Sequence, residues 1–420
     1  MLSIIIPAYA QPEALARTLK SLAGQTAPSD AFEVVIADDA SPEPVGRDVA
    51  GEYPDLAVRV VRHEENRGRS AARNTAVAAA SGELLLFLDA DSIAHPDLVS
   101  VHLKRHTSHD LLVLGRRIEP DWATLHGVAD ADATPWDVSR EQDDLRYYYG
   151  LEQPGLLEAS PWLFTISHNF SLPRRVYEDV GGFDENFRNW GYEDTEFGYR
   201  VYTHWQRDGQ RFLFVPEATV CHVPHFLNSV KNWAGAAEGL TYFEHKHQHF
   251  DIERLRSGNR LSVQSQPQYA RYLLRPGGGS DAALKDLQDI LPGNADRLWA
   301  GRLGDQLSST PAATLDCTQP RSATNRPLIG ISTLFDDDSF GDVVHWDNWR
   351  ILTPGDLSAL IVEGLRLAPT VYLAGTRESE PASPIAQPAD LGCILENSFL
   401  DARTLPGTPH VFVTEIRRRG

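Results

Sequence analysis

The chain has 420 residues, more than the about 250–300 residues at which one hydrophobic core usually stops growing, so we expect more than one domain. Hydrophobic residues make up 42% and charged residues 23%, which is typical of a packed globular protein and excludes a largely disordered one. The 39 Lys and Arg against 58 Asp and Glu give a formal net charge of -19, which disfavours non-specific binding to nucleic acid or to an anionic membrane.

The cysteines and the N-terminus indicate the compartment. Cys221, Cys317 and Cys393 lie far apart and in no metal-binding spacing, so we expect neither a disulfide framework nor a structural zinc site. The first apolar run, residues 2–6, lacks a basic flank and stops at Pro7, which is typical of a buried strand and not of a signal peptide. No stretch approaches the about 18 apolar residues of a membrane span. We therefore expect a cytoplasmic protein with at most peripheral membrane contact.

The first hundred residues alternate apolar strands with amphipathic helices, the pattern of a mostly parallel α/β sheet flanked by helices. Strands are predicted over 2–6, 32–37, 57–62 and 84–88, and helices over 12–24, 43–51 and 70–80. Ligands of such sheets bind beyond the carboxyl ends of the strands. There this chain has Pro7–Tyr9, Asp38–Ser41, His63–Asn66 and Asp89–Asp91. Three of these clusters are polar or acidic, which indicates a binding site at that edge.

The pattern is less regular after residue 120. Residues 120–160 are expected to form an active-site loop or lid. Regular structure is expected to return at 168–172, and a helix that contains Phe197 follows. A helix over 228–257 carries Trp233, and we interpret it as packing on the catalytic domain, with acceptor or membrane contact as the alternative. The run at 275–281 predicts a linker and 281–303 a helical piece. Strands over 328–333, 370–374 and 411–415 and a helix over 354–367 predict a second α/β region.

These patterns divide the chain into three parts. Residues 1–227 form the predicted catalytic domain, 228–305 a helical extension, and 306–420 a small C-terminal α/β accessory domain.

The strongest chemical signal is the apolar strand 84–88, which is followed by Asp89-Ala90-Asp91. Because side chains alternate along a strand, the two carboxylates project to the same side as the chain leaves the sheet. One or two such carboxylates, together with substrate phosphates, hold Mg²⁺ or Mn²⁺. Asp-x-Asp alone is a weak signal because loops are rich in Asp, but its place at the end of a central strand makes it a candidate metal site.

Two further segments have a functional and a structural interpretation. A carboxylate of Asp38 or Asp39 would accept a hydrogen bond from a uracil N–H or a ribose hydroxyl, and Tyr9 would stack on the base. The alternative for the two aspartates is ordinary turn chemistry. Arg69 and Arg73 lie one turn apart at the start of a helix and are candidates for anion binding, with solvated surface as the alternative.

The motifs stand in a specific order: strand-Pro-x-Tyr, strand-Asp-Asp-x-Ser, Asn-x-Gly-x-x-x-Ala-Arg-Asn and strand-Asp-Ala-Asp. In this order residues 2–225 resemble glycosyltransferase family 2, whose catalytic domain has the GT-A fold. The segment from Gly181-Gly-Phe-Asp-Glu to Trp190-Gly-Tyr-Glu193-Asp194 resembles the acceptor-side segment of galactosyltransferase-type C-terminal regions. Ala10 departs from the family, which usually has Asn or another polar residue after the tyrosine.

The resemblance implies a nucleotide-sugar donor, with UDP as the default nucleotide, and a role for each matching position. The implied nucleotide-sugar-binding residues are Pro7, Tyr9, Asp38, Asp39, Arg69, Arg73, Asp89, Ala90 and Trp190. Asp91 is the implied metal ligand, with a later histidine beside it, and position after the strand at 212–215 favours His222 over His225. Trp190 would form a platform for a sugar ring, although a core position is the alternative.

Glu193 and Asp194 are the implied catalytic residues. Glu193 would orient the acceptor hydroxyl, and Asp194 would accept its proton as general base. A carboxylate at the start of a helix stays ionised, which suits this role. Helix capping is the structural alternative for Asp194, and it is compatible with catalysis.

The predicted reaction is a single displacement with inversion at the anomeric carbon, assisted by Mn²⁺ or Mg²⁺. The acceptor is expected to be a glycan, a lipid-linked sugar, a natural product or a protein. One alternative is a non-catalytic sugar-nucleotide-binding scaffold, which would typically lack the base or the metal ligands. A nucleotidyltransferase would carry a Gly-rich basic loop after the first strand, and a dinucleotide-dependent dehydrogenase would carry Gly-x-Gly-x-x-Gly there. Pro7-Ala-Tyr9 stands in that place.

Overall fold

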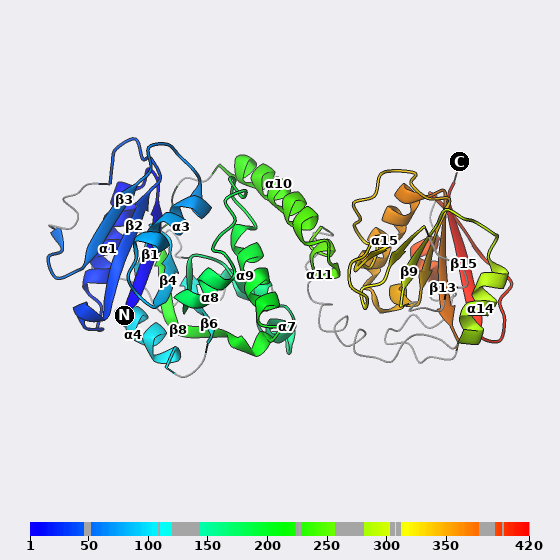
Figure 1. The fold of residues 1–420 in the computed structure, drawn as a ribbon, viewed down its shortest axis with the longest axis horizontal. Coiled ribbons are helices and arrows are strands. Elements are labelled where there is room, and N and C mark those ends of the chain that lie inside the picture. Colours follow the sequence, from blue (N-terminus) through cyan, green and yellow to red (C-terminus); the bar gives the residue numbers. More distant parts are fainter. Residues whose placement is uncertain are drawn as a thin grey trace. The chain divides into compact units, whose positions relative to one another are not determined.

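The structure is a computed structural model, and it describes the chain except for residues 46–51, 108–109, 120–142, 149, 224, 226–227, 257–280, 303–306, 308–311, 378–390, 397–398 and 420. The helix expected over 43–51, the linker over 275–281 and most of the loop over 120–160 therefore lie outside the described residues. The described chain divides into two compact units, Met1–Gly239 and Leu240–Gly420, and each is built around one sheet (Figure 1).

An eight-stranded sheet forms the N-terminal unit, in the order β3-β2-β1-β4-β7-β6-β8-β5. The strands are β1 (Leu2–Ala8), β2 (Phe32–Asp38), β3 (Val58–Arg62), β4 (Leu84–Leu88), β5 (Ser92–Ala94), β6 (Leu112–Ile118), β7 (Asn169–Pro173) and β8 (Phe212–His222). The first four strands pair in parallel, and β6 is also parallel to β8, whereas β7 and β5 pair antiparallel with their neighbours. The prediction of a mostly parallel α/β sheet is confirmed.

Helices cover this sheet. They are α1 (Pro12–Ala23), α3 (Arg69–Ala79), α4 (Leu98–Arg105), α6 (Leu145–Tyr148), α7 (Leu156–Ala159), α8 (Arg174–Asp179), α9 (Glu193–His204) and α10 (Ser229–His247), with short 3₁₀ turns at Ser29–Ala31, Pro161–Phe164 and Gly209–Arg211. The predicted spacing of Leu15, Leu19 and Leu22 places all three on the buried side of α1. They join Ile4 and Ile6 of β1 in one hydrophobic core.

Strand register determines which residues meet at the edge of the sheet. Ser92 of β5 lies opposite His222 of β8, and Ile118 of β6 lies opposite Cys221 of β8. Asp91 directly precedes β5, and Glu119 directly follows β6. These register pairs therefore bring a carboxylate from each side next to His222.

The C-terminal unit contains a seven-stranded sheet in the order β11-β10-β9-β12-β13-β15-β14. Its strands are β9 (Arg297–Gly301), β10 (Ala313–Leu315), β11 (Asn325–Arg326), β12 (Asp342–Trp346), β13 (Thr370–Thr376), β14 (Leu400–Thr404) and β15 (Val411–Arg418). Its helices are α11 (Phe250–Glu253), α14 (Asp281–Ile290), α15 (Pro354–Leu367) and α16 (Gly392–Leu395), with a 3₁₀ turn at Asn348–Ile351. The second α/β region is confirmed.

Two details of this region differ from the predictions. The predicted helix over 281–303 is wrong in its second half, because Pro292 and Gly293 follow α14 and do not continue a helix. The buried residues 297–301 form the interior strand β9 instead. Part of the predicted helical extension thus belongs to the second sheet. The strand predicted over 328–333 is also wrong, since Gly330 has φ of 105° there, and the missed strand β12 lies at the centre of the sheet instead.

Candidate active site

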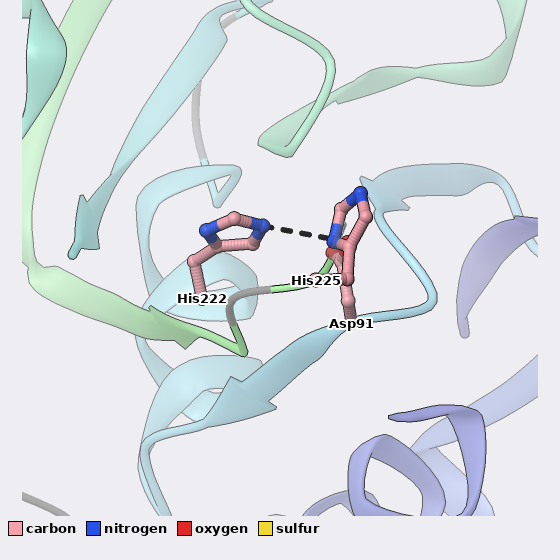
Figure 2. Close-up of side chains that lie close together, drawn as sticks. All are labelled: Asp91, His222 and His225. Carbon is pink, nitrogen blue, oxygen red and sulfur yellow. Dashed lines mark ion pairs between the residues drawn. The ribbon is translucent and has the colours of Figure 1, made fainter. Parts of the chain in front are cut away.

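Three potential metal ligands meet at the ends of β4, β5 and β8: Asp91, His222 and His225 (Figure 2). Oδ2 of Asp91 lies 3.4 Å from Nε2 of His222 and 3.0 Å from Nδ1 of His225. Oδ1 of Asp91 is buried and has no hydrogen-bond partner among the described residues. A carboxylate with an unsatisfied buried oxygen and two imidazole nitrogens fit a divalent cation such as Mn²⁺. Sequence position favours His222, but the structure brings both histidines to Asp91.

The electrostatics of this cluster favour an ionised carboxylate. Burial by itself would raise the pKa of Asp91, but the hydrogen bonds with His222 and His225 hold that pKa well below its usual range. Burial by itself would lower the pKa of His222. Its hydrogen bonds with Asp91 and Glu119 raise that pKa by more than burial lowers it, so the pKa lies above its ordinary value. The carboxylates of Asp91 and Glu119 therefore flank the imidazole of His222, one at each ring nitrogen.

Glu119 is a site residue that the sequence analysis missed. Its Oε2 lies 2.6 Å from Nδ1 of His222, and its Oε1 accepts a hydrogen bond from Nε of Arg117 at 2.7 Å. A carboxylate on the second ring nitrogen is the usual way in which a metal-binding histidine is oriented. No motif marks Glu119, and the only signal is its place directly after β6, which begins with the apolar residues 112–114.

Arg73 connects the Asp-x-Asp segment with the predicted catalytic pair. It is only 2% exposed, with one guanidinium nitrogen 3.5 Å from Oδ1 of Asp89 and another 3.4 Å from Oε1 of Glu193. The guanidinium also lies over the ring of Phe183, 5.1 Å from its centroid. Arg69 lies 3.7 Å from the same Glu193 oxygen with a more exposed side chain. The buried guanidinium of Arg73 therefore contacts both the Asp89 segment and the Glu193 segment, which lie far apart in the sequence.

Asp194 lies in the first turn of α9. Its Oδ2 accepts hydrogen bonds from the backbone N–H and the hydroxyl of Ser167, at 3.1 and 3.5 Å, and its Oδ1 accepts one from the N–H of Thr195 at 2.8 Å. Burial, and then the charge of Glu193, raise the pKa of Asp194 to about 6, although Arg73 opposes the shift. A carboxylate with such a pKa is ionised at neutral pH and still accepts a proton readily.

The two aspartates after β2 are held by the surrounding chain. Asp38 is fully buried, accepts hydrogen bonds from the N–H groups of Ser41 and Val45, and pairs with Arg62. Asp39 lies 2.7 Å from Nδ1 of His63, and its carboxylate also accepts the backbone N–H groups of residues 67 and 68. Both carboxylates therefore stabilise the turns at this edge.

The remaining predicted residues lie on different elements. Tyr9 at the end of the first strand is 49% exposed, so its ring is available for stacking, and Trp190 is 42% exposed. Pro7 is half-buried within β1, and Ala90 is buried between the two aspartates.

The mostly parallel sheet, with Asp91, His222 and His225 at its edge and an acidic pair at the start of α9, is typical of a GT-A glycosyltransferase domain. Residues 3–181 match the sequence model of Glycosyl transferase family 2. Residues 160–224 match the model described as the N-terminal domain of galactosyltransferase. Both family resemblances noted in the sequence are confirmed.

Two characterised relatives each match about half of this chain. Validoxylamine A glucosyltransferase of Streptomyces hygroscopicus subsp. limoneus is 35% identical over 223 residues, which is 49% of this chain and 48% of the relative. Hyaluronan synthase of Pasteurella multocida is 28% identical over 222 residues, 48% of this chain and 23% of the relative. The solved mannosyltransferase of Pyrobaculum calidifontis with GDP-Man and Mn²⁺ is 20% identical, with a TM-score of 0.43 over 69% of this chain and 79% of that chain.

This chain spans about half the length of the validoxylamine A glucosyltransferases that it matches. Among the helices that the structure describes, none is both long and apolar enough to cross a membrane.

Proposed function

We propose that the N-terminal unit transfers a sugar from a nucleotide-diphosphate sugar to an acceptor hydroxyl, with inversion at the anomeric carbon. The observation that carries the proposal is the buried Arg73, which contacts Asp89 and Glu193 at once. The donor-side and acceptor-side motifs thereby form one polar site. A site that only bound nucleotide sugars would not require the acidic pair on α9.

In the proposed reaction, Asp194 accepts the proton of the acceptor hydroxyl while the acceptor oxygen forms its bond to the anomeric carbon. The bond from that carbon to the diphosphate oxygen breaks, and the nucleoside diphosphate leaves. The hydrogen bonds from Ser167 and Thr195 hold the Asp194 carboxylate in one orientation. Glu193, which Arg73 holds in place, orients the acceptor hydroxyl. A single displacement of this kind inverts the configuration and requires no covalent enzyme intermediate.

We further propose that Asp91, His222 and His225 hold Mn²⁺ or Mg²⁺, with Glu119 orienting His222 through its second ring nitrogen. When bound, the cation would supply positive charge to the diphosphate of the departing nucleotide. Arg117 lies 3.8 Å from Asp89 and also contacts Glu119, so it fixes the two carboxylates relative to each other.

On the nucleoside side, the hydrogen bonds of Asp38 and Asp39 hold the turns beside Tyr9. The N–H of Ala10 donates to the hydroxyl of Ser41 at 3.0 Å, which joins the ends of β1 and β2. We propose that Tyr9 stacks on the base and that the nucleotide is UDP. The name of the validoxylamine A glucosyltransferase makes UDP-glucose the first donor to test.

The test is release of nucleoside diphosphate from UDP-glucose, UDP-galactose, UDP-N-acetylglucosamine and GDP-mannose, with water as the acceptor. We expect one UDP-sugar to be hydrolysed in the presence of Mn²⁺, the rate to fall to background in EDTA, and added Mn²⁺ to restore it. Absence of release from every donor would contradict the transferase proposal. Undiminished release in EDTA would contradict the metal role of Asp91.

A further inference from the structure

Two tryptophans of the N-terminal unit are exposed next to each other. Trp190 is 42% exposed and Trp233 on α10 is 72% exposed, whereas the other described tryptophans, Trp162, Trp205, Trp299, Trp346 and Trp349, are buried. The two indole rings meet edge to face, with ring centroids 6.5 Å apart and an angle of 79° between their planes. Trp233 itself therefore faces mostly solvent, although α10 packs against the loop before α9.

Close backbone packing fixes the position of this aromatic pair. A Cβ atom on Gly235 would lie 2.8 Å from Cβ of Asn189, and a Cβ atom on Gly239 would lie 2.6 Å from the carbonyl oxygen of Gly191. Since real Cβ atoms do not approach so closely, only glycine allows α10 to lie this near to the loop before α9. The amide of Asn189 also donates a hydrogen bond to Glu238 of α10 at 2.7 Å. The geometry of the two rings is therefore built into the fold.

The same loop leads directly into the acidic pair. Trp190 precedes Glu193 by three residues, and the N–H of Gly191 donates to Oε2 of Glu193 at 3.1 Å. Any group that rests on the Trp190 ring is therefore held near the residues that we assign to the acceptor.

We propose that Trp190 and Trp233 form an aromatic platform that binds the acceptor through the C–H face of a pyranose ring, so that the acceptor is a carbohydrate. This proposal rests on the proposed function. A pyranose presents an apolar C–H face and a rim of hydroxyls. An indole face suits the apolar C–H face. Asn189 and Glu238 beside the rings keep further hydrogen-bonding capacity for the hydroxyls.

A lipid surface is the competing partner for exposed tryptophans. Helices that lie on membranes carry Lys and Arg on their polar face, which bind anionic headgroups. The polar groups fixed beside this aromatic pair are instead an amide and a carboxylate, and the chain carries a net charge of -19. The amide and carboxylate fixed beside the rings suit the hydroxyls of a carbohydrate better than the anionic headgroups of a lipid surface.

The test is saturation-transfer NMR with methyl β-glucopyranoside, methyl β-galactopyranoside and methyl N-acetyl-β-glucosaminide, on full-length protein with UDP and Mn²⁺. We expect at least one glycoside to bind, Trp233→Ala to weaken binding about three- to tenfold, and Trp233→Phe to retain most of it. Val230→Ala is the matched control, because Val230 is 80% exposed one turn away on α10 and its loss should change nothing. The high exposure of Trp233 makes folding of its variants insensitive to the change, which a melting curve checks.

Binding of no glycoside, or equal binding by wild type and Trp233→Ala, would overturn the platform. So would a loss of binding to phosphatidylcholine–phosphatidylglycerol vesicles in Trp233→Ala with glycoside binding unchanged, which would assign the pair to a membrane. Release of UDP from UDP-sugars is measured on the same preparations. Trp233-dependent glycoside binding without any UDP release would overturn the proposed function and leave the platform standing.

Discussion

Substitution of Asp194 by Asn tests the proposed base directly. The change removes the ionised carboxylate and keeps one oxygen, which accepts the hydrogen bond from Ser167 or the one from Thr195 but not both, because these bonds go to different oxygens of Asp194. Because a positioned general base contributes about 10²- to 10⁴-fold in rate, we expect kcat/KM for sugar transfer to fall by about that factor. The measurement is UDP release under saturating Mn²⁺. The matched control is Asp208→Asn, which changes an exposed carboxylate that caps a 3₁₀ turn.

The pH dependence gives a second readout of the same residue. Burial and the neighbouring Glu193 raise the pKa of Asp194 to about 6, so its basic form is lost as pH falls through that value. At pH 5 about one tenth of the groups are ionised, and we expect kcat/KM to be about tenfold lower than at pH 8. In Asp194→Asn this acid limb should disappear. A variant that retains the wild-type rate, or a wild-type profile that is flat from pH 5 to 8, would refute the assignment.

The raised pKa of Asp194 also makes the stability of the protein depend on pH. The folded-state pKa of Asp194 lies above the about 3.9 of an unfolded chain, so ionisation of this group lowers the free energy of unfolding as pH rises from about 4 to 6. The Asn variant does not ionise. We therefore expect its melting temperature, relative to wild type, to be higher at pH 8 than at pH 4.5. A large loss of stability at pH 8 would mean that the rate loss reports misfolding.

Three further changes test other parts of the structure. Glu119→Gln removes the carboxylate that orients His222 and should weaken activation by Mn²⁺ about 10- to 100-fold, measured as the Mn²⁺ dependence of UDP release. The control is Glu217→Gln, which changes an exposed residue of β8 and should leave this dependence unaltered. Arg73→Met leaves the carboxylates of Asp89 and Glu193 without their buried cation. We expect the free energy of unfolding, measured in urea, to fall by about 3–5 kcal/mol. A loss below about 1 kcal/mol would contradict the role of Arg73 as a bridge between them. Burial raises the pKa of Glu253 well above its ordinary value, so Glu253→Gln should gain stability relative to wild type between pH 5 and pH 8, and a pH-independent difference would contradict this.

Local sequence pattern predicted the first four strands of the N-terminal sheet, β1 to β4, correctly, but not β5 or β6. The apolar runs ending at Pro7, Asp38 and Asp89 are long enough to be buried strands, and the first is followed by α1, a helix with apolar residues at helical spacing. The prediction failed where two patterns compete. Residues 328–333 are as apolar as a strand, but Gly330 takes a left-handed conformation that breaks the run. Residues 297–301 were assigned to a helix because periodicity does not separate short buried strands from helices.

The order of the motifs determined the family and pointed to Asp91, Asp194 and their neighbours, because these residues lie at strand and helix ends that local pattern locates. Tertiary structure decided the rest. Glu119 reaches His222 only because β6 and β8 pair in register, and Trp233 meets Trp190 only because two glycines let α10 approach the loop before α9. Such contacts depend on strand register and helix packing between distant segments. No spacing within one segment encodes them, so the sequence alone could not show them.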